Sequence, residues 1–271
     1  MKLPSSVGVI HLPPLPGSPG AAHLEPSKVM NQICEHAVAE AKLLEKSGFD
    51  GVVLENFGDA PFYKTRVNPE TIASMAVIGK AVRDSIKVSL GINVLRNDAE
   101  AALAIASVIG ADFIRVNVLA GLVATDQGLI EGNAAYLIRE RLRLGSKKIG
   151  ILADVHVKHA KTLSSDDLAI AIEEVAGRGG ADGVIVTGST TGRAPDVDTL
   201  ATAMAAAKHC GVPLYVGSGM TPEGLQSMPV KGLRMIVGST LRTGGKAGAK
   251  LDSLRMKRYM KAWLSYSSVI K

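Results

Sequence analysis

Eight short apolar runs, each followed by a longer amphipathic stretch, constrain the fold of this chain more than any other feature. The runs are rich in β-branched residues and several end in Gly or Asn, which is typical of strands that run into a turn. They span residues 7–11, 51–56, 88–94, 113–118, 149–157, 183–188, 213–219 and 235–240. We therefore predict eight strands that alternate with helices along the whole chain.

The stretches between the runs have the apolar spacing of helices that bury one face. They span residues 27–46, 69–85, 98–109, 133–144, 166–178, 197–209, 222–227 and 253–265. Three residues can accept hydrogen bonds from first-turn amides and are predicted N-caps: Ser27, Asp98 and Asp166. Three glycines supply the permissive backbone that follows a helix end: Gly48, Gly110 and Gly211.

Strands separated by helices require parallel crossovers, and such a sheet either closes into a barrel or stays open with helices on both faces. An open dinucleotide-binding sheet would carry a Gly-x-Gly-x-x-Gly turn after an early strand, and the sequence has none. Eight strands in 271 residues instead match a (β/α)8 TIM barrel, which commonly uses about 250 residues. We predict one such α/β domain over residues 1–271, since no Pro-, Gly- or Ser-rich linker interrupts it.

Composition narrows the class of ligand. The formal net charge is +6, but Lys and Arg are scattered and aromatic residues make up only 4% of the chain, so nucleic acid is not the expected partner. A small anionic ligand accounts better for the positive charge.

The cysteines and the start of the chain bear on its location. Cys34 and Cys210 lie far apart in predicted helices and lack the spacing of metal-ligand pairs, so we expect reduced thiols in a cytoplasmic protein. The first residues lack a signal core, and no apolar window of about 18 residues occurs. Neither export nor membrane insertion is expected.

Polar side chains stand at the carboxyl ends of the apolar runs, where the active sites of parallel barrels lie. Because these ends meet at one face of a barrel, we expect the side chains to converge. They are His11, Glu55, Asn56, Asn93, Arg115, Asn117, Asp154, His156, Thr187 and Ser218. A lone His11 is as often structural as functional, but the group as a whole indicates a functional cluster.

Asp154 and His156 offer acid and base chemistry. Side chains alternate across a strand, so Asp154, His156 and Lys158 share one face if the strand continues, with about 7 Å between neighbours along the backbone. Histidine exchanges protons near neutral pH, and a desolvated carboxylate can act as a base. The predicted catalytic residues are Asp154, His156, Glu55 and His11. The predicted substrate-binding residues are Asn56, Asn93, Arg115, Asn117, Lys158 and Thr187.

Two other uses of these residues stay open. Asp154 and His156 could bind a divalent metal together with Glu55 or His11, since carboxylate and imidazole ligands suit several ions. The sequence has no His-x-x-x-His helix and no cysteine pair, so hydrogen bonding to substrate is the preferred interpretation, and no cofactor is assigned. Lys158 could form a Schiff base if it is buried, although such a lysine is more often solvated.

The last two predicted strands end in matching glycine turns, Val-Gly-Ser-Gly at residues 216–219 and Val-Gly-Ser-Thr at residues 237–240. Their loops are adjacent in a closed barrel. Glycine lets the backbone approach an anion, the hydroxyls add donors, and the start of the following helix offers unpaired amides. The predicted phosphate site consists of Gly217, Ser218, Gly219, Gly238 and Ser239.

Residues 121–132 follow the fourth strand and form the main irregular stretch of the prediction. Their glycines, with Thr125 and Asp126, suit either a lid over the site or a longer surface connection.

Six sequence blocks stand out along nearly the whole chain. They are residues 9–19 (VIHLPPLPGSP), 53–62 (VLENFGDAPF), 91–98 (GINVLRND), 153–160 (ADVHVKHA), 186–192 (VTGSTTG) and 217–219 (GSG). Together they resemble the BtpA/SgcQ family. The resemblance implies a phosphate-binding barrel of the ribulose-phosphate-binding kind, and it makes residues 13–19 a rigid first loop beside the site. It implies no established reaction, because one branch of the family is linked to photosystem I biogenesis and another to a sugar-utilisation gene cluster.

Two functional hypotheses follow. The first is an enzyme that acts on a small phosphorylated sugar or nucleoside-like substrate by acid–base chemistry, as an isomerase, a lyase or a glycosidic-bond-cleaving enzyme. The second is a non-catalytic assembly or regulatory factor of the photosystem I biogenesis type. The ionisable strand ends favour the enzyme. Under either hypothesis, Tyr259, Trp263 and Tyr266 near the C-terminus either pack the last helix or contribute to a homodimer.

Overall fold

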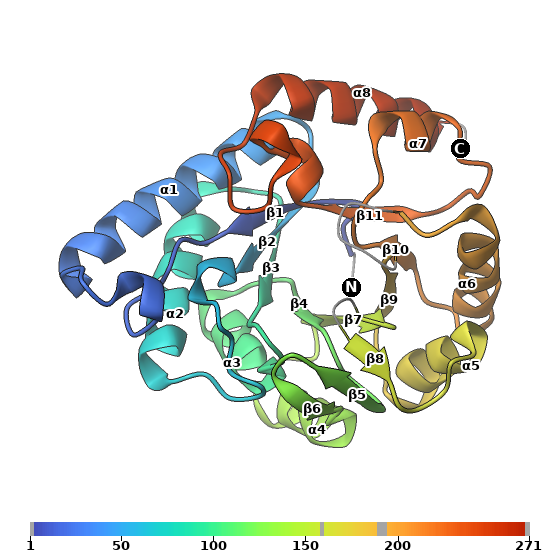
Figure 1. Ribbon diagram of the computed structural model, residues 1–271, viewed down its shortest axis with the longest axis horizontal. Helices are drawn as coiled ribbons and strands as arrows, with labels where there is room; N and C mark the ends of the chain where they lie inside the picture. Colours follow the sequence, from blue (N-terminus) through green and yellow to red (C-terminus); the bar gives the residue numbers. More distant parts are fainter. Residues whose placement is uncertain (1–2, 158–159, 189–193, 269–271) are drawn as a thin grey trace.

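The computed structural model describes residues 3–157, 160–188 and 194–268, and in this part of the chain eight parallel strands close into a barrel (Figure 1). The strands follow one another around the barrel in chain order, and the last pairs with the first. They are β1 Ser6–His11, β2 Gly51–Glu55, β3 Ser89–Asn93, β4 Phe113–Val116, β7 Gly150–Val155, β9 Gly183–Val186, β10 Leu214–Val216 and β11 Arg234–Val237. The predicted TIM barrel is confirmed, although most strands end earlier than their apolar runs predict.

Helices cover the outside of the barrel, as predicted from their apolar spacing (Figure 1). The helices are α1 Pro26–Lys46, α2 Pro69–Ser85, α3 Ala99–Ile109, α4 Ala134–Arg143, α5 Leu168–Glu173, α6 Val197–His209, α7 Pro222–Gln226 and α8 Ser253–Ser268. Short turns of helix are η1 Pro19–Ala21, η2 Phe57–Asp59, η4 Ser239–Leu241 and η5 Thr243–Gly245, and η3 Glu174–Arg178 is a π-helix. No helix of the described residues is both long and apolar enough to cross a membrane.

The predicted helix ends are partly correct. Asp98 caps α3 by accepting a hydrogen bond from the Ala101 amide at 2.9 Å. Ser27 does not cap α1, because the helix begins one residue earlier at Pro26, a residue that favours the first helical position. The three glycines predicted after helix ends all have positive φ: Gly48 at 99°, Gly110 at 72° and Gly211 at 71°.

The helix predicted over residues 166–178 begins later and changes its winding. Asp167, not Asp166, is the cap, and its carboxylate accepts hydrogen bonds from the amides of Ala169 and Ile170. α5 then passes directly into the π-helix η3. Insertion of a wider turn of this kind cannot be predicted from apolar spacing alone.

The stretch at residues 121–132 is ordered, so the prediction of an irregular segment is wrong. It forms a hairpin of β5 Leu122–Thr125 and β6 Gly128–Glu131, with the two-residue tip Asp126–Gln127. The strand β8 Ala160–Thr162 pairs with β5 on its other side. This three-stranded antiparallel sheet stands at the end of β4 and β7, beside the barrel opening (Figure 1).

Side chains that point into the barrel form a separate apolar core. Because side chains alternate along a strand, each strand contributes every second residue to this layer. Its buried members are Val7, Val9, Val53, Phe113, Leu152, Ile185, Tyr215 and Ile236. The barrel is therefore filled below its carboxyl end, and the next inward-facing position on each strand lies at the opening.

The aromatic residues near the C-terminus pack α8 against the barrel. Tyr259 is buried with its ring 6.4 Å from that of Phe49, and Tyr266 donates a hydrogen bond to the Val230 carbonyl at 2.7 Å. Trp263 is buried beside Tyr266. The packing interpretation of these residues is confirmed, and the homodimer stays a prediction.

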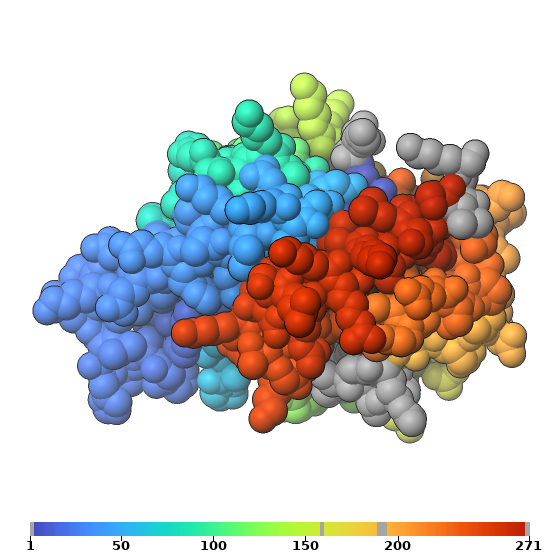
Figure 2. Space-filling view, turned by 90° about the horizontal axis from the view of Figure 1, so that it is seen from above, coloured from blue at the N-terminus to red at the C-terminus, as the bar shows by residue number. Residues whose placement is uncertain are grey.

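A buried ion pair joins the segment that follows β11 to α1. Arg242 has no exposed surface and bonds both carboxylate oxygens of Glu40, each at 2.8 Å. Its guanidinium also donates to the carbonyl of Val9 at 2.9 Å. The segment from η4 to α8 lies against α1 in both views (Figure 1, Figure 2), and this pair fixes it there.

Replacement of Arg242 by Met should lower the free energy of unfolding by about 3–5 kcal/mol, because Glu40 is left as a buried charge without its cation. Urea unfolding measures this loss. The matched change in an exposed pair, Arg143→Met beside Glu140 on α4, should cost less than about 1 kcal/mol. Equal effects of the two changes would contradict the assigned role of Arg242.

Candidate active site

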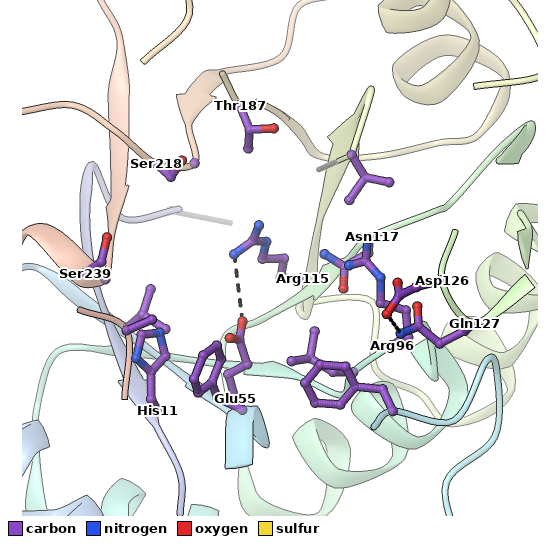
Figure 3. Close-up of a pocket in the computed structure, with 18 residues that line it drawn as sticks. His11, Glu55, Arg96, Arg115, Asn117, Asp126, Gln127, Thr187, Ser218 and Ser239 are labelled. Atoms are coloured by element: carbon purple, nitrogen blue, oxygen red, sulfur yellow. Dashed lines mark hydrogen bonds and ion pairs between the residues drawn. The ribbon is translucent and has the colours of Figure 1, made fainter. Parts of the chain in front are cut away.

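A cavity of about 530 Å³ lies at the carboxyl ends of the barrel strands (Figure 3). Its volume falls within the range of about 300–1,000 Å³ that is common for small-molecule sites. The polar residues that line it are His11, Glu55, Arg96, Arg115, Asn117, Asp126, Gln127, Thr187, Ser218 and Ser239, with Gly217 and Gly238. The apolar part of its wall includes Val9, Phe57, Phe62, Leu95, Val157 and Ala247.

The alternation of side chains along the strands explains why these residues meet. His11 follows Val9 by two positions on β1, and Glu55 follows Val53 by two positions on β2. Arg115 stands in the same relation to Phe113 on β4. On each of these three strands, an inward-facing apolar residue is thus followed by an inward-facing polar residue at the opening.

Asp154 is a buried carboxylate near the carboxyl end of β7. Its side chain is 0% exposed, and it accepts hydrogen bonds from Arg115 Nε at 3.2 Å and Nη2 at 3.1 Å. The Asn117 amide donates a third bond at 2.6 Å. These bonds leave Asp154 outside the lining of the cavity, so the structure assigns it to orienting Arg115 and Asn117 and not to direct contact with a ligand.

Arg115 carries its charge between two carboxylates. Burial lowers the pKa of the Arg115 guanidinium, but the negative charges of Asp154 and Glu55 raise it by more. The pKa therefore lies above its ordinary value. The distance from Arg115 Nη1 to Glu55 Oε2 is 3.9 Å. Arg115 therefore offers a fixed positive charge at the cavity wall.

Glu55 is a buried carboxyl at the end of β2. Burial raises the pKa of its carboxyl above the ordinary 4.5, Arg115 lowers it in part, and the negative charge of Asp154 raises it again. A carboxylate with a raised pKa takes up a proton more readily near neutral pH than an exposed one does. Figure 3 shows Glu55 pointing into the cavity toward Arg115.

His11 is held as a neutral imidazole. Burial, followed by the charges of Arg242 and Arg115, lowers its pKa to about 3. Its Nδ1 accepts a hydrogen bond from the Gly248 amide at 3.0 Å, and its ring stacks on Phe57 at 4.5 Å. Because Nδ1 accepts, the proton of the neutral ring is on Nε2, which makes Nε2–H a hydrogen-bond donor beside Gly238.

The two glycine turns face the cavity together. A Cβ on Gly217 would lie 2.6 Å from Ile185 and 2.8 Å from Thr187, so the backbone there passes close to the neighbouring strand. Thr187 Oγ1 is buried and has no hydrogen-bond partner among the described residues. Gly217, Ser218, Gly238 and Ser239 all line the cavity, and Thr187 lines it beside them.

Two details of the predicted phosphate site differ. Gly219 has a φ of 78° and shapes the turn but does not line the cavity. The helix after β10 begins at Pro222, which has no amide hydrogen, and its Thr221 cap already binds the Gly224 amide. The Gly217 amide in turn donates to the Val186 carbonyl at 2.8 Å.

His156 does not join the cavity, which corrects the prediction that it shares a face with Asp154. β7 ends at Val155, and His156 has a φ of 51°, so the alternation stops there. Its Nε2 lies 3.0 Å from the Ser165 carbonyl. Lys158, the third residue of that predicted face, lies outside the described residues.

Asn56 and Asn93 are also used within the fold and do not line the cavity. Asn56 donates to Asp59 at 3.1 Å and accepts from the Leu95 amide at 2.7 Å. Asn93 donates to the Arg115 carbonyl at 3.1 Å and to Asn117 at 3.3 Å. Both side chains hold neighbouring loops and strand ends in place, and Asn93 Oδ1 is buried with no hydrogen-bond partner among the described residues. Residues 13–19 likewise contribute nothing to the cavity wall.

Arg96, Phe57, Phe62, Asp126 and Gln127 line the cavity but are not among the predicted site residues. They lie beyond strand ends, where alternation gives no orientation. Arg96 lies in the sequence block at residues 91–98, and its place in that block is the sequence feature that could have identified it as a site residue. Among the residues that the structure describes, no group of three or more His, Cys, Asp or Glu side chains is placed to hold a metal ion.

A closed parallel barrel with a polar cavity at the carboxyl ends of its strands defines this protein as a TIM barrel. The chain belongs to the BtpA family, whose model matches residues 3–264. It is 43% identical over 256 residues to the photosystem I biogenesis protein BtpA of Synechocystis, covering 94% of this chain and 86% of that protein. It is 45% identical to an uncharacterized protein of Pyrococcus abyssi, covering 94% of each.

Solved structures agree on the fold. A structure of KGPDC from Streptococcus mutans matches with a TM-score of 0.57 at 11% identity, covering 98% of this chain and 99% of that one. At this identity the likeness supports the barrel and no particular reaction.

The neutral state of His11 predicts a pH dependence of stability. In the folded chain the ring stays unprotonated down to about pH 3, whereas in the unfolded chain it binds a proton near pH 6.5. Its stabilising contribution is therefore complete above pH 6.5 and is lost as pH falls toward 3, by up to about 1.4 kcal/mol per pH unit.

Urea unfolding of the wild type and of His11→Gln over this range measures the effect. The stability difference between the two proteins should shift steadily against the wild type as pH falls below 6.5. His23→Gln, which removes an exposed histidine, gives the baseline. If the stability difference between the wild type and His11→Gln does not vary with pH, His11 has the same pKa in the folded and the unfolded chain.

Proposed function

We propose that this protein is an enzyme that acts on a small phosphorylated sugar or nucleoside-like substrate by acid–base chemistry at the barrel opening. The observation that carries the proposal is the buried Glu55, with its raised pKa, in the same cavity as the loops at Gly217–Ser218 and Gly238–Ser239. One end of the cavity suits an anion, and its middle suits proton transfer.

The phosphate of the substrate is assigned to the two loops. Glycines there let backbone amides approach an anion, and Ser218 and Ser239 add hydroxyl donors. Thr187 Oγ1, which lacks a partner among the described residues, is a further donor at the same end. Phosphate sites in TIM barrels are frequently built from the loops after the last two strands, which supports this assignment.

The reacting atoms are assigned to the middle of the cavity. Glu55 accepts a proton from a substrate carbon next to a carbonyl group, and the electron pair of the broken C–H bond moves onto the carbonyl oxygen. Arg115 and the Nε2–H of His11 donate hydrogen bonds to that oxygen as its negative charge grows. Asp154 keeps Arg115 in place for this role. An isomerisation is complete when Glu55 returns the proton to the former carbonyl carbon and a hydroxyl proton moves between the two oxygens. An elimination is complete when a leaving group on the next carbon departs with its bonding electron pair and takes the proton from Glu55, and the same course cleaves a glycosidic bond when that leaving group is the glycosidic substituent.

The relative from Synechocystis, named a photosystem I biogenesis protein, supports a second candidate function, that of an assembly or regulatory factor. In that case the cavity would bind a ligand without turning it over. The two functions are separated by turnover, since both predict binding of a phosphorylated compound and only the enzyme consumes it.

Replacement of Glu55 by Gln should reduce turnover by about 100- to 10,000-fold, because the amide keeps the shape of the carboxyl but cannot take up a proton. Mass spectrometry of a panel of sugar phosphates and nucleotides identifies the compound that the wild type consumes. The activity of the wild type should fall as pH is lowered through the raised pKa of Glu55.

Glu35→Gln on the exposed face of α1 removes the same charge far from the cavity and should leave turnover unchanged. Full activity of Glu55→Gln would refute its role as the base. Binding of a phosphate ester without turnover by the wild type would favour the assembly or regulatory factor.

Replacement of Ser239 by Asp should weaken the binding of ribose 5-phosphate by about tenfold or more, because the new carboxylate repels phosphate at short range. Isothermal titration calorimetry measures the affinity, and unphosphorylated ribose shows how much of it depends on phosphate. Ser265→Asp on the exposed face of α8 adds the same charge elsewhere and should have little effect. Equal losses in the two variants would point to overall charge and not to the loops.

A further inference from the structure

The tip of the β5–β6 hairpin forms the end of the cavity opposite the glycine loops. Asp126 and Gln127 line the wall together with Arg96, whereas Ser218 and Ser239 line the other side. Figure 3 shows Glu55 and Arg115 between these two groups. A ligand whose phosphate occupies the loops therefore extends past the reacting groups toward Gln127.

The amide of Gln127 has a defined orientation. Its Nε2 lies 2.6 Å from Asp126 Oδ2, and a carboxylate can only accept, so the nitrogen must be the atom that donates. Its Oε1 is then left as an acceptor. This oxygen is buried and has no hydrogen-bond partner among the described residues.

A buried acceptor without a partner costs stability unless a donor reaches it. The cavity is the space that Gln127 faces, so a ligand is the natural source of that donor. The requirement is specific: a ligand atom at this end must carry an N–H or O–H group.

The hairpin is held in place before a ligand binds. Val123 and Ile130 are buried in a small apolar cluster with Val118 and Val157, which secures the hairpin to the barrel. Pairing of β5 with β8 fixes its other edge. The acceptor is therefore preorganised, which increases its contribution to selectivity.

Apolar residues line the same cavity as the acceptor. Phe62 and Leu95 line the cavity, and the Arg96 amide donates to the Tyr63 carbonyl at 3.1 Å, which ties the two segments together. The charge of Arg96 is in turn attracted by that of Asp126 at the hairpin tip. Phe62, Leu95 and the tip thus belong to one end of the cavity. A sugar hydroxyl could satisfy the acceptor but would gain little from the apolar surface, whereas a planar heterocycle uses both.

We propose that the substrate carries, at the end opposite its phosphate, a planar nitrogen heterocycle with a ring N–H, as in a nucleoside monophosphate, and that Gln127 determines specificity by accepting its hydrogen bond. This inference rests on the proposed function, since the phosphate in the glycine loops sets the direction of the ligand. Arg96 and Asp126 frame the heterocycle, and Phe62 and Leu95 supply the apolar contacts.

Calorimetric titration of the full chain with three probes tests the inference: uridine 5′-monophosphate, its derivative methylated on the ring nitrogen, and ribose 5-phosphate. The wild type should bind the unmethylated nucleotide about tenfold or more tightly than either of the others. In Gln127→Met, which keeps the length of the side chain but removes the acceptor, this preference should fall to near one. Leu129→Ala, at an exposed position of the same hairpin that does not line the cavity, should keep the wild-type preference.

The outcomes separate the two proposals. If ribose 5-phosphate binds but the nucleotide binds no more tightly, or if Gln127→Met keeps the preference, the inference about Gln127 is overturned and the proposed function stands. If none of the three phosphate esters binds, the proposed function fails, and the inference fails with it.

Discussion

The carboxylate of Asp154 is the group on which the arrangement of the barrel opening depends. It is removed from solvent and accepts hydrogen bonds from Arg115 and Asn117, so it fixes the two residues that line the centre of the cavity. Arg115 in turn lies close enough to Glu55 to affect its protonation. Burial is the main cause of the raised pKa of Glu55, and Asp154 adds to that rise while it fixes the position of the neighbouring positive charge.

The barrel and the place of its site were predictable because both follow from simple periodicities. Apolar runs alternating with amphipathic stretches gave the strands and helices, and the alternation of side chains placed His11, Glu55 and Arg115 at the opening. The same rule failed at His156, because it holds only while the strand lasts and β7 ends at Val155. The hairpin at residues 121–132 was missed since its short strands carry little apolar signal.

What sequence could not supply was the pairing of polar groups with one another. Asn56, Asn93 and Asp154 stand at strand ends, as predicted, yet each forms hydrogen bonds within the fold and none lines the cavity. Whether a polar side chain at a strand end serves a ligand or its neighbours depends on distances of an ångström or less. Gln127 differs from these residues, because it lies in a hairpin loop and not at the end of a barrel strand, and yet it lines the cavity.

The resulting site has three parts in a row. Bare backbone and hydroxyls stand at one end, a buried carboxyl and a fixed cation in the middle, and an acceptor and apolar side chains toward the other end. Each part makes a separate demand on a ligand, and a compound that meets all three must be elongated, with its phosphate at one end. The proposed function depends on this order of the three parts of the cavity.

A crystal structure of the protein with ribose 5-phosphate bound tests it most directly. We predict that the phosphate lies between the loops at Gly217–Ser218 and Gly238–Ser239, with the sugar directed toward Glu55. A phosphate bound beside Arg96 at the hairpin end, or no bound ligand at saturating concentration, would contradict the account.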